Sequence, residues 1–291
     1  MKHGLAAGAG HAPERPDWTV DQAWARYSPA EHAVWRTLFE RQSRLLPGRA
    51  CDEFLRGMRE LPIAPDRIPD FERLSEALMK RTRWQIVAVP GLVPDEVFFE
   101  HLAHRRFPAG RFIRQPHELD YLEEPDVFHD VFGHVPMLMS PVIADYIQAY
   151  GQGGLRAQRL GVLEKLARVY WYTVEFGLVR QPDGLRLYGA GIASSATETV
   201  FSLDDESPTR LRFELERVMR TRYCIDDFQE TYFVLDRLDD LLELASIDFA
   251  PIYERLAEAP DIGPGARLEA DEVITCGTGR HHAGKCKGGV A

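Results

Sequence analysis

The sequence is poor in cysteine, and it lacks any long apolar run. Its 291 residues include only Cys51, Cys224, Cys276 and Cys286, too few and too irregularly spaced for a disulfide framework. No apolar stretch approaches the roughly 20 residues that cross a bilayer. The N-terminus also lacks the apolar core of a secretory signal. We therefore expect reduced thiols, no membrane partner and a cytoplasmic location.

An excess of positive charge is absent as well. Lys and Arg number 35 against 45 Asp and Glu, which gives a formal net charge of −10. A negative chain is repelled by phosphate backbones, so nucleic acid is excluded as a partner. What the chain does have is the composition of an ordinary folded domain, with 45% apolar and 27% charged residues.

The two ends differ in composition from the middle. Residues 1–15 and 260–291 are rich in Gly and show no hydrophobic periodicity, so we expect two flexible tails around one domain at 16–259. The C-terminal segment holds His281, His282 and Cys286. Without a second ligand pair at zinc-site spacing, these residues do not predict a metal site.

Apolar residues in the middle mostly recur at helical spacing, so the chain is predicted to be mainly helical with minor sheet. Helices are expected at about 70–81, 95–106, 140–150, 161–180, 208–221 and 235–245, with Ser207 and Pro208 as N-cap and first residue of the fifth. Strands are expected at about 85–89, 111–114, 185–188 and 231–235.

Two histidines lie five positions apart in the segment EPDVFHDVFGHVPML, His129 and His134. On a regular α-helix, five residues turn through about 500°, so the two rings would point about 140° apart. Gly133 and Pro136 flank His134 and break the helix there. We expect this break to let both imidazoles reach one centre, either as metal ligands or as two hydrogen-bonded core histidines.

One carboxylate, Glu175, stands in the aromatic run LARVYWYTVEFGLV. The run is buried whether it is helix or strand, and a buried carboxylate must be neutral, paired or bound to a metal. Arg168 and Arg180 lie at spacings that suit no helical ion pair. Glu175 is therefore predicted to be a metal ligand.

Two imidazoles and one carboxylate fit two kinds of site: a hydrolytic zinc centre, or the facial triad of non-haem Fe(II) oxygenases. The number of ligands does not decide between them. The sequence lacks the His-Glu-x-x-His motif of many zinc hydrolases, and aromatic residues crowd the ligand segments. An apolar or aromatic substrate suits such surroundings.

Three segments, HDVFGHVP, YWYTVEFGL and YGAGIASS, resemble the signature segments of the pterin-dependent aromatic amino acid hydroxylases. The resemblance extends in order from Trp84 to Pro251. It implies a mainly α (α+β) fold, a single helical, basket-like catalytic domain with small β-sheet elements. It also implies one Fe(II) ion bound by His129, His134 and Glu175.

The resemblance further implies where the substrate binds. The carboxylate-binding arginine of the family falls on Arg114, and the residue that packs against the substrate ring falls on Trp171. Ser194, Ser195 and Glu198 match the loop that lines the amino acid pocket.

A pterin site is implied in the same way. Gly91 and Leu92 would offer backbone groups to the pterin edge, and Phe98 would stack on its ring. Tyr170 and Ala193 fall beside the cofactor in the family.

The reaction implied by the resemblance is hydroxylation of L-phenylalanine to L-tyrosine. O₂ is the co-substrate, and tetrahydrobiopterin or a related tetrahydropterin is the reductant. Trp171 and Ile225 favour phenylalanine over tryptophan and tyrosine, although tryptophan or another ring position stays open as an alternative. A zinc-dependent hydrolase with the same ligands is the alternative from another class. The chain is expected to be a monomer, since its C-terminal segment has no heptads.

Overall fold

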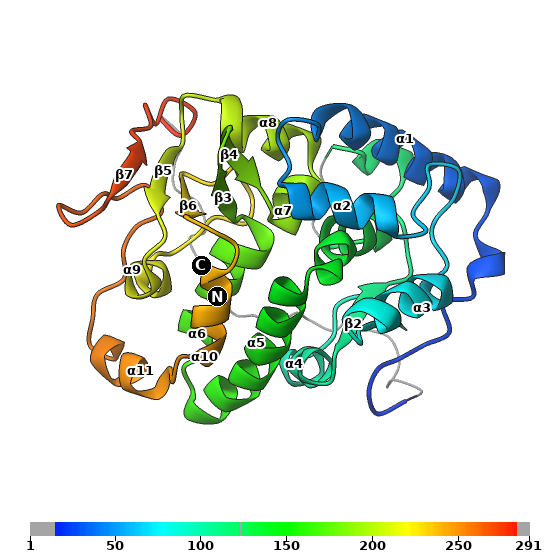
Figure 1. Ribbon diagram of the computed structural model, residues 1–291, viewed down its shortest axis with the longest axis horizontal. Helices are drawn as coiled ribbons and strands as arrows, with labels where there is room; N and C mark the ends of the chain where they lie inside the picture. Colours follow the sequence, from blue (N-terminus) through cyan, green and yellow to red (C-terminus); the bar gives the residue numbers. More distant parts are fainter. Residues whose placement is uncertain (1–14, 121, 123, 284–291) are drawn as a thin grey trace.

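The computed structural model describes residues 15–120, 122 and 124–283. The fold is mainly helical with a small amount of sheet, which confirms the predicted fold class (Figure 1). The helices are α1 (Pro29–Leu45), α2 (Asp52–Glu60), α3 (Phe71–Arg81), α4 (Asp95–Ala103), α5 (Pro141–Leu160), α6 (Leu163–Tyr170), α7 (Ala190–Ala193), α8 (Ala196–Asp204), α9 (Leu215–Arg220), α10 (Asp240–Ser246) and α11 (Ala250–Leu256). The strands are β1 (Gln85–Val89), β2 (Arg106–Gly110), β3 (Leu178–Gln181), β4 (Gly184–Leu187), β5 (Thr209–Arg212), β6 (Thr231–Leu235) and β7 (Val273–Thr275).

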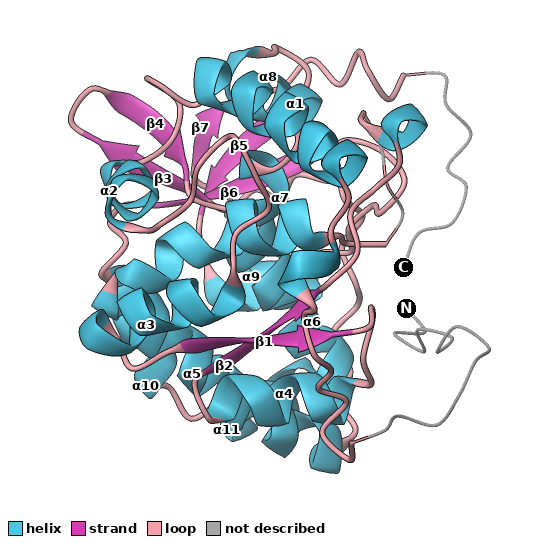
Figure 2. Ribbon diagram, turned by 90° about the vertical axis from the view of Figure 1, so that its right-hand side faces the viewer, coloured by secondary structure: helices cyan, strands magenta, loops and turns pink. Residues whose placement is uncertain are grey.

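The strands form two separate sheets. β1 and β2 make a parallel pair, and the other five strands form a mixed sheet in the order β4-β3-β6-β5-β7. Figure 2 shows the pair in the lower half of the molecule near α3 and α4, and the larger sheet at the top. β6 is the central strand of the larger sheet, and all five of its residues are buried.

The local sequence of helix α1 determines where the helix begins, and the buried face of the helix contacts a segment of the candidate site. Ser28 caps it in a reciprocal capping box with Glu31, and Pro29 occupies its first position. The buried face includes Trp35, whose ring meets Phe128 edge-on at 5.3 Å between centroids. Since Phe128 immediately precedes His129, α1 supports the segment that bears both histidines.

The helix predicted over 208–221 begins only at Leu215. Thr209–Arg212 instead pairs in parallel with β6 as strand β5, because burial in the sheet outweighs the local start signal at Ser207 and Pro208. The cap of the shorter helix is Glu214, which accepts hydrogen bonds from the backbone of Glu216 and Arg217. The strand expected at 111–114 is likewise displaced to Arg106–Gly110.

The prediction of a flexible C-terminal tail was wrong for residues 260–283. Strand β7 pairs antiparallel with β5, and Ile262 forms a bridge with Thr221. A buried ion pair joins Arg217 to Asp271 at 2.8 Å. These contacts are tertiary, so the Gly-rich composition of the segment gave no local sign of them. Cys286 and most of the predicted N-terminal tail, residues 1–14, lie outside the described residues.

Within the described part of the chain, no helix is both long and apolar enough to span a bilayer.

Candidate active site

The two histidines lie on one π-helical segment, Phe128–His134. The expected break at Gly133 does not occur, because His134 keeps helical backbone angles and the chain continues directly into a 3₁₀ turn. A π-helical turn joins residues five apart, and this places His129 and His134 on the same face. Gly133 has another role: a Cβ atom there would lie 2.8 Å from the Ala190 carbonyl oxygen, so its absence lets α7 approach.

The carboxylate lies on a second π-helical segment, Trp171–Glu175, which continues from α6. The backbone N–H of Phe176 donates to the Trp171 carbonyl at 2.8 Å and closes the turn. Strand β3 then begins at Leu178. The predicted helix at 161–180 is therefore correct for its first part, and its last residues belong to the sheet. π-Helical turns are rare and occur often at functional sites.

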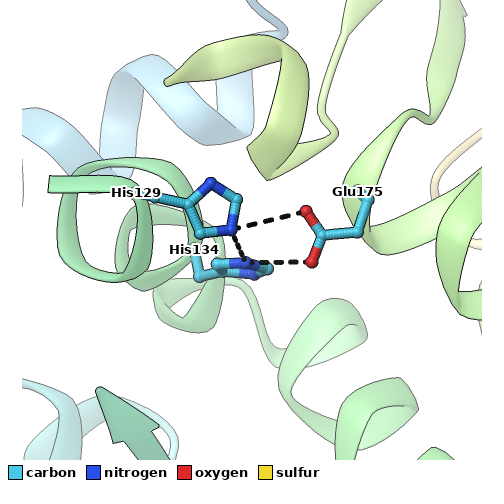
Figure 3. Close-up of side chains that lie close together, drawn as sticks. All are labelled: His129, His134 and Glu175. Carbon is cyan, nitrogen blue, oxygen red and sulfur yellow. Dashed lines mark hydrogen bonds and ion pairs between the residues drawn. The ribbon is translucent and has the colours of Figure 1, made fainter. Parts of the chain in front are cut away.

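The three side chains converge on one point, as Figure 3 shows. Nε2 of His134 lies 3.1 Å from Nε2 of His129 and 3.2 Å from Oε1 of Glu175, and Nε2 of His129 lies 3.6 Å from Oε2 of Glu175. Two imidazole nitrogens that face each other and a carboxylate are well explained by a shared cation. Two nitrogens and one carboxylate oxygen form the donor set of a non-haem iron site.

A hydrogen bond fixes the tautomer of His129. The Ser194 hydroxyl donates its only proton to the Ala190 carbonyl at 2.8 Å, so it accepts from Nδ1–H of His129 at 2.9 Å. Nε2 of His129 is thereby left as a lone pair toward the centre. Burial lowers the pKa of His129 to about 4, so the ring is neutral at physiological pH.

Glu175 is held in its ionised form. Burial alone would raise its pKa, but the facing imidazoles of His134 and His129 outweigh this effect and lower it. A neutral imidazole beside an ionised carboxylate is the protonation state that metal binding requires.

Two of the three residues, His129 and Glu175, line one cavity of about 650 Å³, and His134 is not among its lining residues. This volume falls in the range typical of small-molecule sites. The cavity is also lined by most of the predicted substrate and pterin residues: Arg114, Trp171, Ser194, Ser195, Glu198, Gly91, Leu92, Phe98 and Tyr170. Ala193 is not among the lining residues. It is fully buried, and its carbonyl accepts a hydrogen bond from Gln42.

Arg114 is held by a carboxylate that sequence reasoning missed. Nε and Nη2 of Arg114 each donate to Asp126 at 2.9 Å, and the backbone N–H of Arg114 donates to the same carboxylate. Asp126 is fully buried, and its Oδ1 also accepts from the backbone of His129. The side edge of the guanidinium is thus occupied, which leaves the Nη1 and Nη2 end as a fork for a second carboxylate.

Trp171 lies flat against Tyr223, with ring centroids 4.1 Å apart and an interplanar angle of 15°. Its indole N–H donates to Oε1 of Gln229 at 2.9 Å. Gln229 in turn donates to the Cys224 carbonyl at 2.8 Å. The loop between α9 and β6 therefore fixes the orientation of Trp171, a contact that nothing in the local sequence indicates.

Ser195 and Glu198 begin helix α8. Ser195 is the N-cap and accepts from the backbone of Glu198 at 3.2 Å. The Glu198 carboxyl accepts a hydrogen bond from the Tyr232 hydroxyl inside the protein. Burial raises the pKa of Glu198 to about 7, although the bond from Tyr232 acts in the opposite direction.

We expect Glu198 to make stability fall as the pH rises. The pKa is about 7 in the folded chain against 4.5 for an exposed Glu, so the folded state binds this proton more tightly between those values. At pH values above the pKa of Glu198 in the folded chain, the ionised carboxylate lowers the free energy of unfolding by about 3 kcal/mol relative to the protonated form. Glu198→Gln should remove this loss, which urea unfolding of both proteins at about pH 5 and about pH 8 would measure. Equal pH dependence in the two proteins would contradict the prediction.

The pterin residues are arranged partly as expected. Phe98 meets Tyr170 edge-to-face at 6.0 Å, and Tyr170 lies parallel to the His134 ring at 6.4 Å. The Leu92 N–H, expected to face the pterin, instead donates to the Glu124 carboxylate at 3.0 Å. A Cβ atom at Gly91 would collide with the same carboxylate. Glu124 therefore occupies the backbone edge that the resemblance assigned to the cofactor.

Similarity to known proteins extends over most of the chain. The model of the family described as biopterin-dependent aromatic amino acid hydroxylase matches residues 21–255. Phenylalanine-4-hydroxylase of Caulobacter vibrioides is 64% identical over 264 residues, which cover 91% of this chain and 90% of that protein.

Solved structures of phenylalanine hydroxylase from Chromobacterium violaceum share the fold. One, with iron and phenylalanine bound, is 55% identical, has a TM-score of 0.87, and the match covers 91% of this chain and 97% of that chain. Another, with iron(III) and 7,8-dihydrobiopterin bound, is 56% identical with a TM-score of 0.86, and the match covers 90% of this chain and 95% of that chain. This chain belongs to the biopterin-dependent aromatic amino acid hydroxylase family.

Proposed function

We infer that this chain is a pterin-dependent iron monooxygenase that hydroxylates L-phenylalanine to L-tyrosine with O₂. The main support for this function is the convergence of His129, His134 and Glu175, two of which, His129 and Glu175, line one aromatic-lined cavity. The relatives named above, which act on or bind phenylalanine, support it. The same cavity is lined by the buried guanidinium of Arg114.

We propose that Nε2 of His129, Nε2 of His134 and the Glu175 carboxylate hold Fe(II). When bound, Fe(II) and the reduced pterin supply O₂ activation and two electrons, so that one oxygen atom enters the ring and the other leaves with the pterin. Ser194 keeps the His129 ring in the tautomer that presents Nε2. A facial triad of this kind would leave coordination positions of the iron available to O₂.

The substrate is positioned by charge at one end and by aromatic packing at the other. The free fork of Arg114 suits the α-carboxylate, while Asp126 holds the guanidinium still. The α-ammonium suits Glu198, because a nearby cation favours ionisation of a buried carboxyl whose pKa is raised. Trp171, fixed by Gln229, packs against the ring. Orientation of this kind reduces the entropic barrier to reaction.

The pterin is proposed to lie against Phe98 and Tyr170, with Gly91 and Leu92 at its edge. Since the Leu92 N–H is bonded to Glu124, pterin binding at this edge requires Glu124 to move or to share its hydrogen bond. Ser195 caps helix α8 and so fixes the wall of the cavity that carries Glu198.

We also propose that the enzyme works as a monomer in the cytoplasm. The cavity and all the residues assigned to it come from one chain, which supports catalysis without a partner subunit. The low cysteine content supports a reducing compartment, where iron stays Fe(II). Sedimentation of the purified enzyme should give the mass of one chain, and a stable dimer or tetramer would contradict the proposal.

The function is tested by chromatography of the product. The enzyme is incubated with Fe(II), a tetrahydropterin and, separately, phenylalanine, tyrosine and tryptophan, with a parallel set that contains Zn(II). We expect tyrosine from phenylalanine, only with both Fe(II) and pterin. A ring isomer of tyrosine would correct the position of hydroxylation. Absence of a pterin-dependent product from all three amino acids would contradict the proposal.

A further inference from the structure

A second cluster of metal-binding side chains lies apart from the catalytic triad. Asp227, from the loop between α9 and β6, meets His281 and His282 of the C-terminal segment. One ligand atom from each residue lies within 4.8 Å of those of the other two. The residues are 54 and 55 positions apart in sequence, so the pair of histidines acquires its carboxylate only through the fold.

The geometry of this cluster parallels that of the catalytic one. The rings of His281 and His282 are 4.8 Å apart at 78°, against 4.9 Å and 80° for His129 and His134. Nε2 of His281 lies 2.8 Å from Asp227 Oδ1, and Nε2 of His282 lies 3.9 Å from Asp227 Oδ2. These separations bracket the roughly 3.3 Å between ligand atoms of a tetrahedral zinc site.

Packing and backbone hydrogen bonds hold the two histidines in place. The His281 ring meets Phe201 edge-on at 5.2 Å and Phe228 at 5.0 Å. The backbone N–H of His281 donates to the Ser207 hydroxyl at 2.9 Å. The side chains of His281, His282 and Asp227 remain 29%, 12% and 26% exposed. The cluster is thus preorganised and still open to solvent.

We propose that Asp227, His281 and His282 bind a divalent first-row transition ion, for which Zn²⁺ is the best match. Two imidazoles and a carboxylate are common zinc donors. In this structure Nε2–H of His282 donates to the Phe228 carbonyl at 2.9 Å. In the same way, Nε2–H of His281 donates to Asp227 Oδ1 at 2.8 Å. On binding, both protons move to Nδ1 of their rings, so that both Nε2 atoms become ligands and the Phe228 carbonyl becomes a further available oxygen donor.

The ion has a structural role that reaches the catalytic cavity. Asp227, Phe228 and Gln229 all line that cavity, and Gln229 orients Trp171. Metal binding ties the C-terminal segment to this loop, so it stabilises the fold and the substrate side of the cavity together. The site does not depend on the identity of the catalytic reaction.

The test is zinc binding by the iron-loaded enzyme. The enzyme carrying one iron per chain is dialysed against micromolar Zn²⁺, and both metals are measured in the same sample. The double variant His281→Ala/His282→Ala removes both nitrogens, and Asp227→Asn keeps the shape of the side chain but removes its charge. The control His104→Ala/His117→Ala removes two exposed histidines elsewhere.

We expect the wild type and the control to bind one zinc per chain in addition to iron, and to gain thermal stability with zinc. Asp227→Asn and the double variant should keep their iron, bind less than a tenth as much extra zinc and show no such gain. Equal zinc uptake by the wild type and the double variant would overturn the proposal, as would uptake matched by an equal loss of iron.

Discussion

Glu175→Gln is expected to abolish iron-dependent hydroxylation while leaving the fold intact. The change keeps the shape of the side chain but removes the negative charge that faces His129 and His134. Removing residues that merely support a ligand weakens metal binding by about 10- to 100-fold, so loss of the ligand itself should lower iron affinity by more than about 100-fold. Iron content and tyrosine formation are measured on the same preparation.

Glu100→Gln provides the matched control, because Glu100 is exposed on helix α4 far along the chain from the triad. It should retain the iron and activity of the wild type. Full iron occupancy and activity in Glu175→Gln would show that this carboxylate is not an iron ligand.

Arg114→Ala is expected to damage both stability and substrate binding. The guanidinium and Asp126 form a buried, bidentate pair, with side chains 9% and 0% exposed. Removing one partner leaves an uncompensated buried charge, which costs about 3–5 kcal/mol of unfolding free energy. The α-carboxylate of phenylalanine loses its fork at the same time, so KM should rise more than kcat falls.

Two further variants separate these effects. Arg114→Lys keeps a positive charge beside Asp126, but an ammonium group cannot make bidentate hydrogen bonds to Asp126 and to the substrate carboxylate. This variant should therefore retain more of the stability than Arg114→Ala and still show a raised KM. Arg67→Ala removes an exposed pair with Asp66, 57% and 52% exposed, and should change stability by less than about 1 kcal/mol. Urea unfolding and phenylalanine saturation curves provide the measurements. A normal KM in Arg114→Lys would exclude Arg114 from substrate binding.

The elements best predicted from sequence are those in which local pattern and tertiary burial agree. The strands at 85–89 and 231–235 have the predicted bounds, and helix α3 begins one residue after its predicted start. The prediction failed at 208–221 because the start signal at Ser207 and Pro208 is local, whereas the pairing of β5 with β6 is not. The same reason applies to residues 260–283, whose order comes from contacts with α9 and β5.

The candidate site, like the fold, could be predicted from the sequence only in part. The types of the three converging residues predict a metal centre without any structure, since a buried carboxylate must be neutral, paired or bound to a metal. The way His129 and His134 meet was predicted wrongly, because hydrogen bonding of the π-helical kind is not visible in residue spacing. Asp126 had a signal, since it is an acidic residue three positions before His129 and directly before the apolar pair Val127 and Phe128. The local sequence gives no signal for Gln229 or Asp227, because their partners are brought near only by the fold.

Isotope labelling shows whether the oxygen of the new hydroxyl group comes from O₂. The enzyme, loaded with Fe(II) and supplied with a tetrahydropterin and phenylalanine, is allowed to react under ¹⁸O₂ in ordinary water, and the tyrosine is analysed by mass spectrometry. A monooxygenase built on His129, His134 and Glu175 predicts one ¹⁸O atom in the ring hydroxyl of each tyrosine. Tyrosine whose hydroxyl oxygen came from water, or formation of product without O₂, would contradict it.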